Sequence, residues 1–269
     1  FKDFTGRPIN EINLYSSEMA SALCSIDRVS ASANMNNRLS EAIVEAYKKT
    51  SGSPITFTMM LKEYQAKMTD PAKDDSISSV LKQLVRANIF EEEDKADLIG
   101  DCYIIKMDGY PKDGPIAKAI VYFLISKLNN IYEQLEKQAT NDDVVQIRHS
   151  SIIDEAHYML DFDNRPLRNL IAVGRNKGLS IILATQNMSS FKSKGFDFYA
   201  NAQYPLIMKQ QTIDDKVIKD LFGVSGNELQ EIRTAIAGLQ KGELIIKDQM
   251  AFALSMGKKY KKINVTHLI

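Results

Sequence analysis

The sequence has no excess of charge of either sign, few cysteines and no long apolar run. Lysine plus arginine and aspartate plus glutamate both number 34, so no global basic field favours nucleic acid, and any DNA contact must be local. The two cysteines, Cys24 and Cys102, lie far apart in apolar sequence, which predicts reduced thiols and excludes a disulfide framework, a zinc pattern and a redox motif. No apolar run reaches the roughly 20 residues of a spanning helix, and no signal peptide is recognisable. We therefore expect a soluble, cytoplasmic protein without a membrane partner.

The 269 residues are enough for two domains. Residues 11–97 show the 3.6-residue periodicity of helices. One apolar stripe ends at the breaker 51–54, a second is rich in methionine, and a third is the cleanest; they comprise Leu39, Ile43, Ala46 and Tyr47, then Met59, Met60, Tyr64 and Met68, then Ile77, Val80, Leu81, Leu84 and Val85. The methionine-rich face fits gap-filling core or, alternatively, a partner helix. The acidic run 91–94 fits a solvated linker or an interaction tail.

From residue 101 the pattern alternates between strands and helices. We predict a strand over 102–107, a helix from Pro115 to about Leu135, and a second strand that holds Asp154 and Glu155 at its end. A helix over about 167–176 then leads to a strand over 180–186. Strand, helix and strand in this order predict right-handed βαβ units and a parallel sheet.

The C-terminal part is predicted to hold short elements. After a polar loop, 187–195, we expect a strand over 204–208 and two short helices, the second with a capping box of Ser225 and Glu228. Strands over 243–246 and 250–254 would pair through a turn at 247–249. The end is basic, with Lys258, Lys259, Lys261 and Lys262, and fits a solvated tail or, alternatively, a phosphate contact.

Acidic and amide side chains follow two of the predicted strands. The segment 150–157 reads SSIIDEAH, so Asp154 and Glu155 come directly after a β-branched run, and Gln186 ends the next strand along the chain. Parallel strands deliver such side chains to one edge of a sheet, where open α/β folds bind ligands. A solvated strand end is the alternative for either strand alone.

This set of groups suits hydrolysis of a nucleoside triphosphate. That reaction needs Mg²⁺ on the phosphates, an oriented water and positive charge on the transition state. Asp154 can hold the metal through water, Glu155 can polarise the attacking water as a general base, and Gln186 can sense the γ-phosphate, because an amide both donates and accepts.

The segment IIDEAH resembles the Walker B strand of P-loop ATPases. The stretch 173–186, VGRNKGLSIILATQ, is similar to a pattern of the HerA/FtsK class of DNA-translocating hexamers, and 242–246, GELII, resembles a late strand of that core. The likeness covers about 98–254. It implies an α/β fold, the C-terminal part of a RecA-like P-loop NTPase sheet with an N-terminal helical subdomain. The implied domains are 1–97, helical insertion or lid; 98–257, ATPase core; and 258–269, basic tail.

The resemblance also implies roles and partners. Asp154 matches the Mg²⁺-coordinating acid, Glu155 the catalytic glutamate, Gln186 the sensor, and Arg175 an arginine supplied in trans to the neighbouring subunit's γ-phosphate. Lys177 is the second candidate for contact with the nucleotide. An arginine that merely stabilises a helix end is the alternative for Arg175. The implied cofactors are ATP and Mg²⁺, and the implied partners are duplex DNA and further copies in a hexamer. Within the class, the general texture resembles DptH/DndH-type ATPases of phosphorothioation-linked restriction and phage defence.

One departure from the class concerns the phosphates. The sequence contains no G-x-x-x-x-G-K-[ST], and Gly257 with Lys258 and Lys259 lacks the upstream glycine and the hydroxyl. Since the chain starts without methionine, we expect that loop upstream of Phe1. The alternative is a non-catalytic scaffold subunit.

Two further features bear on partners. Lys192 and Lys194, in a loop with an aromatic residue after the sensor strand, are candidates for DNA contact, although an ordinary exposed loop fits as well. His149, His157 and His267 are too scattered for a metal site. His157 is interpreted as a structural neighbour of Glu155, able to couple the site to the adjoining chain.

Overall fold

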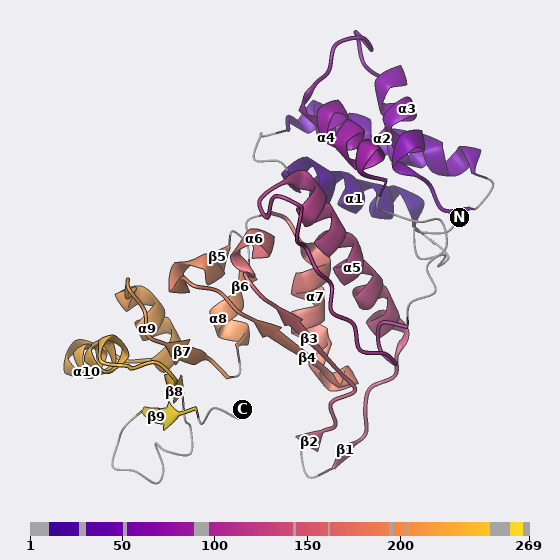
Figure 1. The fold of residues 1–269 in the computed structure, drawn as a ribbon. Coiled ribbons are helices and arrows are strands. Elements are labelled where there is room, and N and C mark those ends of the chain that lie inside the picture. Colours follow the sequence, from indigo (N-terminus) through magenta and orange to yellow (C-terminus); the bar gives the residue numbers. More distant parts are fainter. Residues whose placement is uncertain are drawn as a thin grey trace. The chain divides into compact units, whose positions relative to one another are not determined.

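The computed structural model describes residues 11–26, 31–50, 53–88, 97–141, 144–160, 162–193, 196–202, 204–247 and 259–265 (Figure 1). The chain divides into two compact units, which we describe one at a time. The first comprises Phe1–Ser151 and Asp161–Ser180, and the second comprises Ile152–Leu160 and Ile181–Ile269. This division falls elsewhere than at residue 97, and the domain boundaries predicted from the sequence stay a prediction.

Four helices open the first unit. They are α1 (Ile12–Ile26), α2 (Ala33–Lys49), α3 (Phe57–Ala66) and α4 (Ser76–Ala87), and each packs on the next. The predicted helices are confirmed, since Leu39, Ile43 and Tyr47 on α2 are fully buried. Met60 and Tyr64 on α3 are buried as well, so the methionine-rich face is core. The acidic run 91–94 lies outside the described residues.

Asp75 joins three of these helices. It begins α4 with a capping box: Asp75 Oδ1 accepts from Ser78 N, and Ser78 Oγ accepts from Asp75 N, both at 2.9 Å. The other carboxylate oxygen of Asp75, Oδ2, accepts from Tyr64 Oη of α3 at 2.6 Å and from Arg38 Nη1 of α2 at 3.4 Å. Burial, followed by this hydrogen bond, raises the pKa of the Tyr64 hydroxyl.

The strand predicted over 102–107 is wrong. These residues form neither helix nor strand, and the side chains of Tyr103, Ile104 and Ile105 are 47%, 86% and 52% exposed. Residues of high β propensity form a strand only where a neighbouring strand pairs with them, and none does in the described part of the chain. Cys102 is accordingly exposed, whereas Cys24 on α1 is buried, and burial raises the pKa of its thiol to about 12. The first predicted βαβ unit therefore lacks its first strand.

The next predicted helix is α5 (Pro115–Gln134), with Gly114 before it and Pro115 in its first turn. It packs against α7 (Arg165–Val173), α1 and α4. A small antiparallel pair, β1 (Thr140–Asn141) and β2 (Val144–Val145), follows α5 in the sequence and precedes the next strand.

The second βαβ unit is confirmed. It consists of β3 (His149–Ile153), the short α6 (His157–Leu160), α7, the 3₁₀ turn η1 (Arg175–Lys177) and β4 (Leu179–Leu183). β3 and β4 are hydrogen-bonded neighbours in a two-stranded sheet, and the backbone hydrogen bonds at their two ends show that they run parallel. They start together, because Arg148 N and His149 N donate to Gly178 O, and they end together, where Ala184 N donates to Ile153 O at 2.9 Å.

The second unit contains the remaining elements. They are η2 (Met188–Phe191), β5 (Lys192–Ser193), β6 (Phe196–Asp197), α8 (Phe198–Asn201), β7 (Leu206–Met208), α9 (Asp215–Phe222), α10 (Gly226–Ala237), β8 (Glu243–Lys247) and β9 (Tyr260–Asn264). β7, β8 and β9 form an antiparallel sheet in that order, with Ile207 opposite Ile245.

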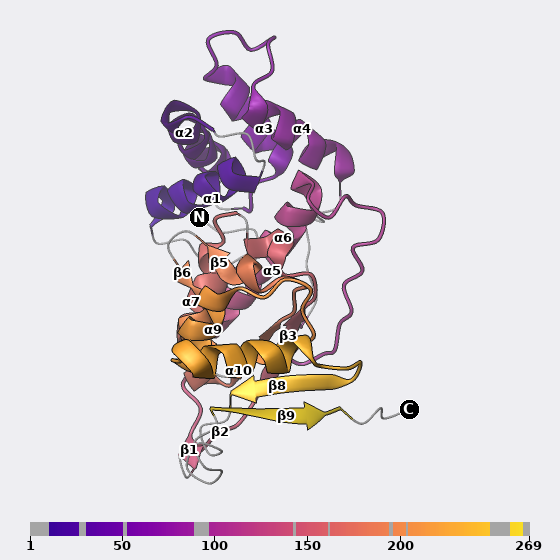
Figure 2. The same cartoon turned by 90° about the vertical axis from the view of Figure 1, so that its left-hand side faces the viewer.

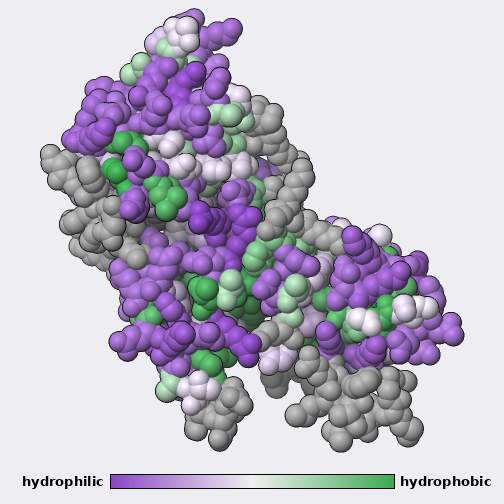
Figure 3. Space-filling view, turned by 180° about the vertical axis from the view of Figure 1, so that it is seen from behind, coloured by the Kyte–Doolittle hydropathy of each residue, from purple (hydrophilic) through white to green (hydrophobic). Residues whose placement is uncertain are grey.

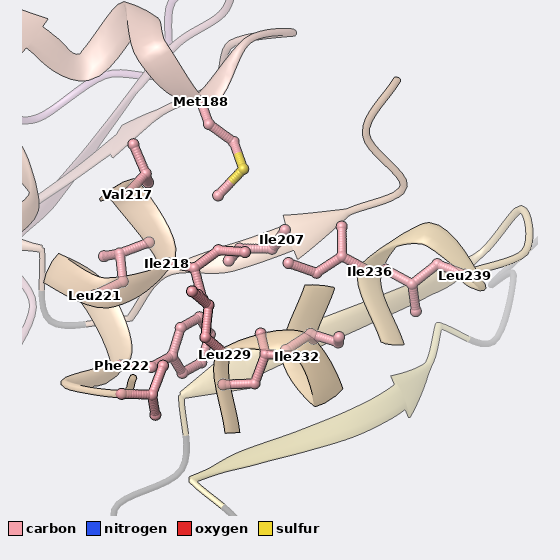
Figure 4. Packing of buried hydrophobic residues seen from close by; sticks show 12 residues of the cluster. Met188, Ile207, Val217, Ile218, Leu221, Phe222, Leu229, Ile232, Ile236 and Leu239 are labelled. Atoms are coloured by element: carbon pink, nitrogen blue, oxygen red, sulfur yellow. The ribbon is translucent and has the colours of Figure 1, made fainter. Parts of the chain in front are cut away.

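An apolar core joins this sheet to its helices. Figure 2 shows α10 lying along β8, and Figure 4 shows how their side chains meet. Ile207 and Ile245 from the sheet pack with Val217 and Ile218 of α9 and Ile236 of α10, and all five are buried. Burial of this kind stabilises the unit, at roughly 25 cal/mol per Å² of apolar surface removed from water.

Two expectations for this unit, the capping box and the solvated basic tail, need correction, and a third concerns residues outside the described ranges. Ser225 makes no side-chain hydrogen bond at the start of α10, and Glu228 instead pairs with Lys259 at 3.5 Å, so the predicted capping box is absent. The predicted strand 250–254 lies outside the described residues. β8 pairs with β9, which comes from the segment expected to be a solvated basic tail, and Lys262 Nζ contacts Glu243 Oε2 at 2.6 Å.

The surface seen in Figure 3 is mostly hydrophilic, with smaller hydrophobic patches between the hydrophilic residues. Large apolar side chains that are exposed include Ile152 on β3 and Ile182 on β4. Within the described ranges, no helix has both the length and the hydrophobicity needed to cross a lipid bilayer.

Candidate functional site

The polar ends of β3 and β4 meet, as predicted for parallel strands. Their pairing continues beyond the strands themselves, since Ala184 N donates to Ile153 O at 2.9 Å and Ala156 N donates to Ala184 O at 2.8 Å. Asp154 and Glu155 on one side and Gln186 on the other therefore leave the same edge, the edge at which parallel sheets bind ligands.

The backbone turns sharply at Glu155. Its φ is +50°, in the left-handed region that residues with a side chain seldom adopt. The backbone N–H of Glu155 donates to Asp154 Oδ1 at 2.8 Å, and Tyr158 N donates to Glu155 O at 3.1 Å as α6 begins. The turn takes the chain from strand to helix in a few residues, and it is a strained position of the kind that occurs at functional sites.

Both oxygens of the Glu155 carboxylate have partners. Gln186 Nε2 donates to Oε1 at 2.7 Å, and His157 Nδ1 lies 3.4 Å from Oε2. Thr185 Oγ1 lies 3.3 Å from the same His157 nitrogen. The side chains of His157 and Glu155 are about a quarter exposed, 26% and 25%. Sequence reasoning assigned no role to Thr185; its place directly before Gln186, after the same strand, was the available signal.

Asp154 is the side chain that can hold a metal ion. It is exposed, and one of its oxygens is engaged by the Glu155 N–H. Within the described part of the chain, no three His, Cys, Asp or Glu side chains are grouped so that they could hold a metal ion. Mg²⁺ usually binds one or two carboxylates together with waters and substrate phosphates. With Glu155 engaged by Gln186 and His157, Asp154 as the metal-binding carboxylate fits Mg²⁺ that is bound through its hydration shell.

The histidines form no metal site in the described residues. His149 Nε2 lies 2.9 Å from Ser151 Oγ, and burial lowers the pKa of the His149 imidazole. His267 lies outside the described residues.

Arg175 and Lys177 lie in the first unit, on the turn between α7 and β4. Lys177 Nζ donates to the carbonyls of Tyr132 and Glu133 at 2.6 and 3.0 Å, so this ammonium group satisfies the C-terminal end of α5. Arg175 is exposed. These contacts give Lys177 a structural role.

The glycines that bound this turn have packing roles. Gly178 has a φ of +81°, and a Cβ there would lie 2.6 Å from Gln146 O. A Cβ on Gly174 would lie 2.5 Å from Leu170 O and 2.8 Å from Leu179 Cδ2. The glycine spacing of GRNKG thus follows from close backbone approach between α7, β4 and the start of β3.

The candidate DNA-binding lysines are only partly described. Lys192 is in β5, which pairs antiparallel with β6. The side chain of Lys192 and the whole of Lys194 lie outside the described part.

Comparison with known proteins identifies the fold. No protein-family model matches the chain, and no curated protein does. Among solved structures, VirB4 of Thermoanaerobacter pseudethanolicus aligns with a TM-score of 0.60 and 17% identity over 99% of this chain and 76% of VirB4. The bacterial conjugative coupling protein TrwB, in its unbound monoclinic form, gives 0.53 and 12% over 98% of this chain and 70% of its own. The plasmid coupling protein TrwB with the non-hydrolysable ATP analogue ADPNP gives 0.54 and 11% over the same shares.

These similarities show a shared fold. The chain has the mixed α/β fold of VirB4 and TrwB, which is the RecA-like P-loop NTPase fold that the sequence predicted, and β3 and β4 form its parallel strand pair.

Proposed function

We propose that the chain is the C-terminal portion of an ATP-hydrolysing motor of the HerA/FtsK type that moves duplex DNA. The observation that carries the proposal is the 2.7 Å hydrogen bond between Gln186 and Glu155, at the carboxyl edge of a parallel strand pair. A base and an amide in contact at this edge can act on one water and one phosphate group.

Each side chain at this edge has a proposed role. Asp154 would hold Mg²⁺ through water, and the bound ion would supply positive charge to the phosphates of ATP. Glu155 accepts a proton from the attacking water as general base. Gln186 contacts the γ-phosphate through its amide, and its hydrogen bond to Glu155 therefore changes when ATP binds.

Arg175 is proposed to act on the nucleotide of a neighbouring subunit. Arg175 is an exposed residue at the turn after α7, and its guanidinium group is permanently charged and can bind phosphate oxygens in a fork. This role requires an oligomer, for which a hexamer is the form that the resemblance implies. Lys177 is the weaker candidate, because α5 carbonyls occupy its ammonium group.

The partner and the pathway are finer parts of the proposal. Duplex DNA is assigned from the resemblance, with Lys192 and Lys194 as contacts. The TrwB structures belong to a conjugative coupling protein, which favours a role in DNA transfer. Restriction and phage defence of the DptH/DndH type is the other pathway. Deletion of the gene should lower conjugative transfer in the first case and raise phage plating efficiency in the second.

A non-catalytic scaffold is the second candidate, and the observation that favours it is the absence of G-x-x-x-x-G-K-[ST] from the 269 residues. The complete gene decides between the two. A phosphate-binding loop encoded upstream of Phe1 favours the motor, and its absence there favours the scaffold.

The test of the motor is ATP turnover by the complete gene product, with and without duplex DNA. Glu155→Gln removes the base but keeps the shape of the side chain, so turnover should fall by at least about 100-fold while ATP binding is retained. Unchanged turnover would remove Glu155 from its role. In mixed oligomers, Arg175→Ala subunits should turn over ATP only beside a wild-type neighbour that supplies the arginine. Equal loss in all mixtures would contradict action in trans.

A further inference from the structure

His157 lies against Glu155 on the side opposite Gln186. Its Nδ1 is 3.4 Å from Glu155 Oε2, and Gln186 Nε2 is 2.7 Å from Oε1. The carboxylate is therefore held between an imidazole from the start of α6 and an amide from the end of β4. All three side chains belong to the second unit.

The contact indicates which imidazole nitrogen carries the proton. At 3.4 Å, an unprotonated Nδ1 would hold its lone pair close to the carboxylate oxygen of Glu155, which is repulsive, whereas a protonated Nδ1 places the positive end of an N–H dipole beside that oxygen, which is attractive. Thr185 Oγ1, 3.3 Å from Nδ1, can accept from the same N–H. Thr185 Oγ1 also accepts from Asn187 N at 3.5 Å, and its hydroxyl can still donate to Nδ1 or accept from it, so Thr185 is compatible with both tautomers. The carboxylate of Glu155 therefore decides, and it favours the Nδ1–H tautomer of His157.

The imidazole ring is held in place by its surroundings. Besides Thr185, the Tyr158 ring lies against it, with the two ring centroids 4.1 Å apart and the planes 37° apart. A ring fixed on two sides can fix a third group in turn, as partners behind a catalytic side chain commonly do.

Gln186 cannot hold Glu155 throughout a catalytic cycle. As the proposed sensor, its amide must turn to the γ-phosphate when ATP binds, and Glu155 Oε1 then loses its 2.7 Å partner. His157 needs no such movement, because it contacts the other oxygen, Oε2. The release of Oε1 frees that oxygen to accept a proton from water, while the contact to Oε2 keeps the side chain aimed.

We propose that His157 is a positioning residue for Glu155, and that Thr185 orients it through the same ring nitrogen. This inference rests on the proposed function, in which Glu155 is the general base. It gives His157 a place in the reaction without contact to the nucleotide, the metal or the water.

The contact itself can be tested on the 269-residue chain without any activity. Long-range ¹H–¹⁵N spectra at alkaline pH show which nitrogen of each histidine carries a proton, and His157→Asn identifies the signals of His157. We expect the Nδ1–H tautomer in the wild type and in Thr185→Val, and the Nε2–H tautomer in Glu155→Ala. An Nε2–H tautomer in the wild type, or no change in Glu155→Ala, would overturn the inference.

The consequence for catalysis is tested in the complete gene product. His157→Ala should lower kcat by roughly 100-fold and leave KM for ATP unchanged, because a misaimed base slows the chemical step without weakening binding. His157→Asn places an amide N–H near the position of Nδ1 and should restore most of kcat, whereas His157→Gln places its amide farther out and should not. Equal effects of Asn and Gln, or an unchanged kcat in His157→Ala, would contradict positioning through Nδ1.

The two experiments fail separately. A wild type that hydrolyses no ATP, with or without DNA, refutes the proposed function. The positioning inference then falls as a statement about catalysis, and the tautomer measurement still decides whether His157 holds the Glu155 side chain.

Discussion

At the scale of single residues, the site depends on a few side chains at a strained turn. Glu155 combines a left-handed backbone with a carboxylate that is held at both oxygens. Strain of this kind persists when surrounding contacts fix the conformation, and here the continued pairing of Ala156 with Ala184 does so. The turn is therefore a structural feature of this sheet edge, and its strain can be tested by stability measurements that do not depend on catalysis.

Replacing Glu155 by glycine should give a more stable protein than replacing it by alanine. Both changes remove the same contacts, but alanine keeps the Cβ strain of a left-handed residue, about 1–2 kcal/mol. The glycine variant in turn loses about 0.4–1 kcal/mol of stability, because glycine raises the conformational entropy of the unfolded chain. We expect Glu155→Gly to exceed Glu155→Ala by about 0.5–1 kcal/mol in free energy of unfolding, measured in urea.

Ser150 provides the matched control for that comparison, because it lies in β3 and is not among the residues with positive φ. There the order should reverse, with Ser150→Ala more stable than Ser150→Gly. If the alanine variant is more stable than the glycine variant at both positions, the turn at Glu155 is not strained.

At the scale of elements, helix starts show how local patterns succeed or fail. Asp75 and Ser225 both precede a helix with a polar residue three positions later. Only Asp75 forms a capping box, and Ser78 is its partner. Asp75 is also held by Tyr64 and Arg38 from neighbouring helices, whereas the best-placed partner for Ser225, Glu228, is drawn to Lys259. Tertiary contacts thus decide whether a local capping signal is used.

Asp75→Ala should destabilise the chain much more than Ser225→Ala. The first change removes a cap, worth about 0.5–2 kcal/mol, and leaves the buried Tyr64 hydroxyl without its acceptor, at about 1–3 kcal/mol. The second removes no hydrogen bond of the hydroxyl and should cost less than about 0.5 kcal/mol. Urea unfolding of the two variants checks this, and a comparable cost for both would contradict the assignment of the caps.

At the scale of the whole molecule, the proposed motor takes only part of its nucleotide site from this chain. Nearly the whole length of this chain aligns with the folds of VirB4 and TrwB. The chain also brings the candidate acid, base and sensor side chains to one sheet edge. The loop that grips phosphates is missing from its sequence. In the proposed motor, phosphate binding must therefore come from polypeptide outside these 269 residues.

The isolated 269-residue chain should bind ATP and Mg²⁺ only weakly. Most phosphate affinity in P-loop proteins comes from the backbone N–H groups and lysine of that loop, and Asp154 with Gln186 cannot replace them. Titration calorimetry should detect no binding in the micromolar range, and the complete gene product is the control if its gene encodes the loop. Micromolar binding by the 269 residues would refute this division of the site.

The sequence alone determined the features that depend on local periodicity and on strand direction. Helical spacing located α2, α3, α4 and α5, because an apolar stripe needs only one buried face to identify it. The βαβ pattern made β3 and β4 parallel, and parallel strands end at one edge, so Asp154, Glu155 and Gln186 could be grouped before the structure was known.

Only the tertiary structure decided the features that depend on distant partners. The segment 102–107 has the composition of a strand but no paired neighbour among the described residues, while the basic segment 260–264 became β9 because β8 offered it an edge. Lys177 donates to a carbonyl at the end of α5, and His157 contacts Thr185, which is 28 residues away in the sequence. Pairing and hydrogen bonding across such separations are set by how elements pack, which no local pattern encodes.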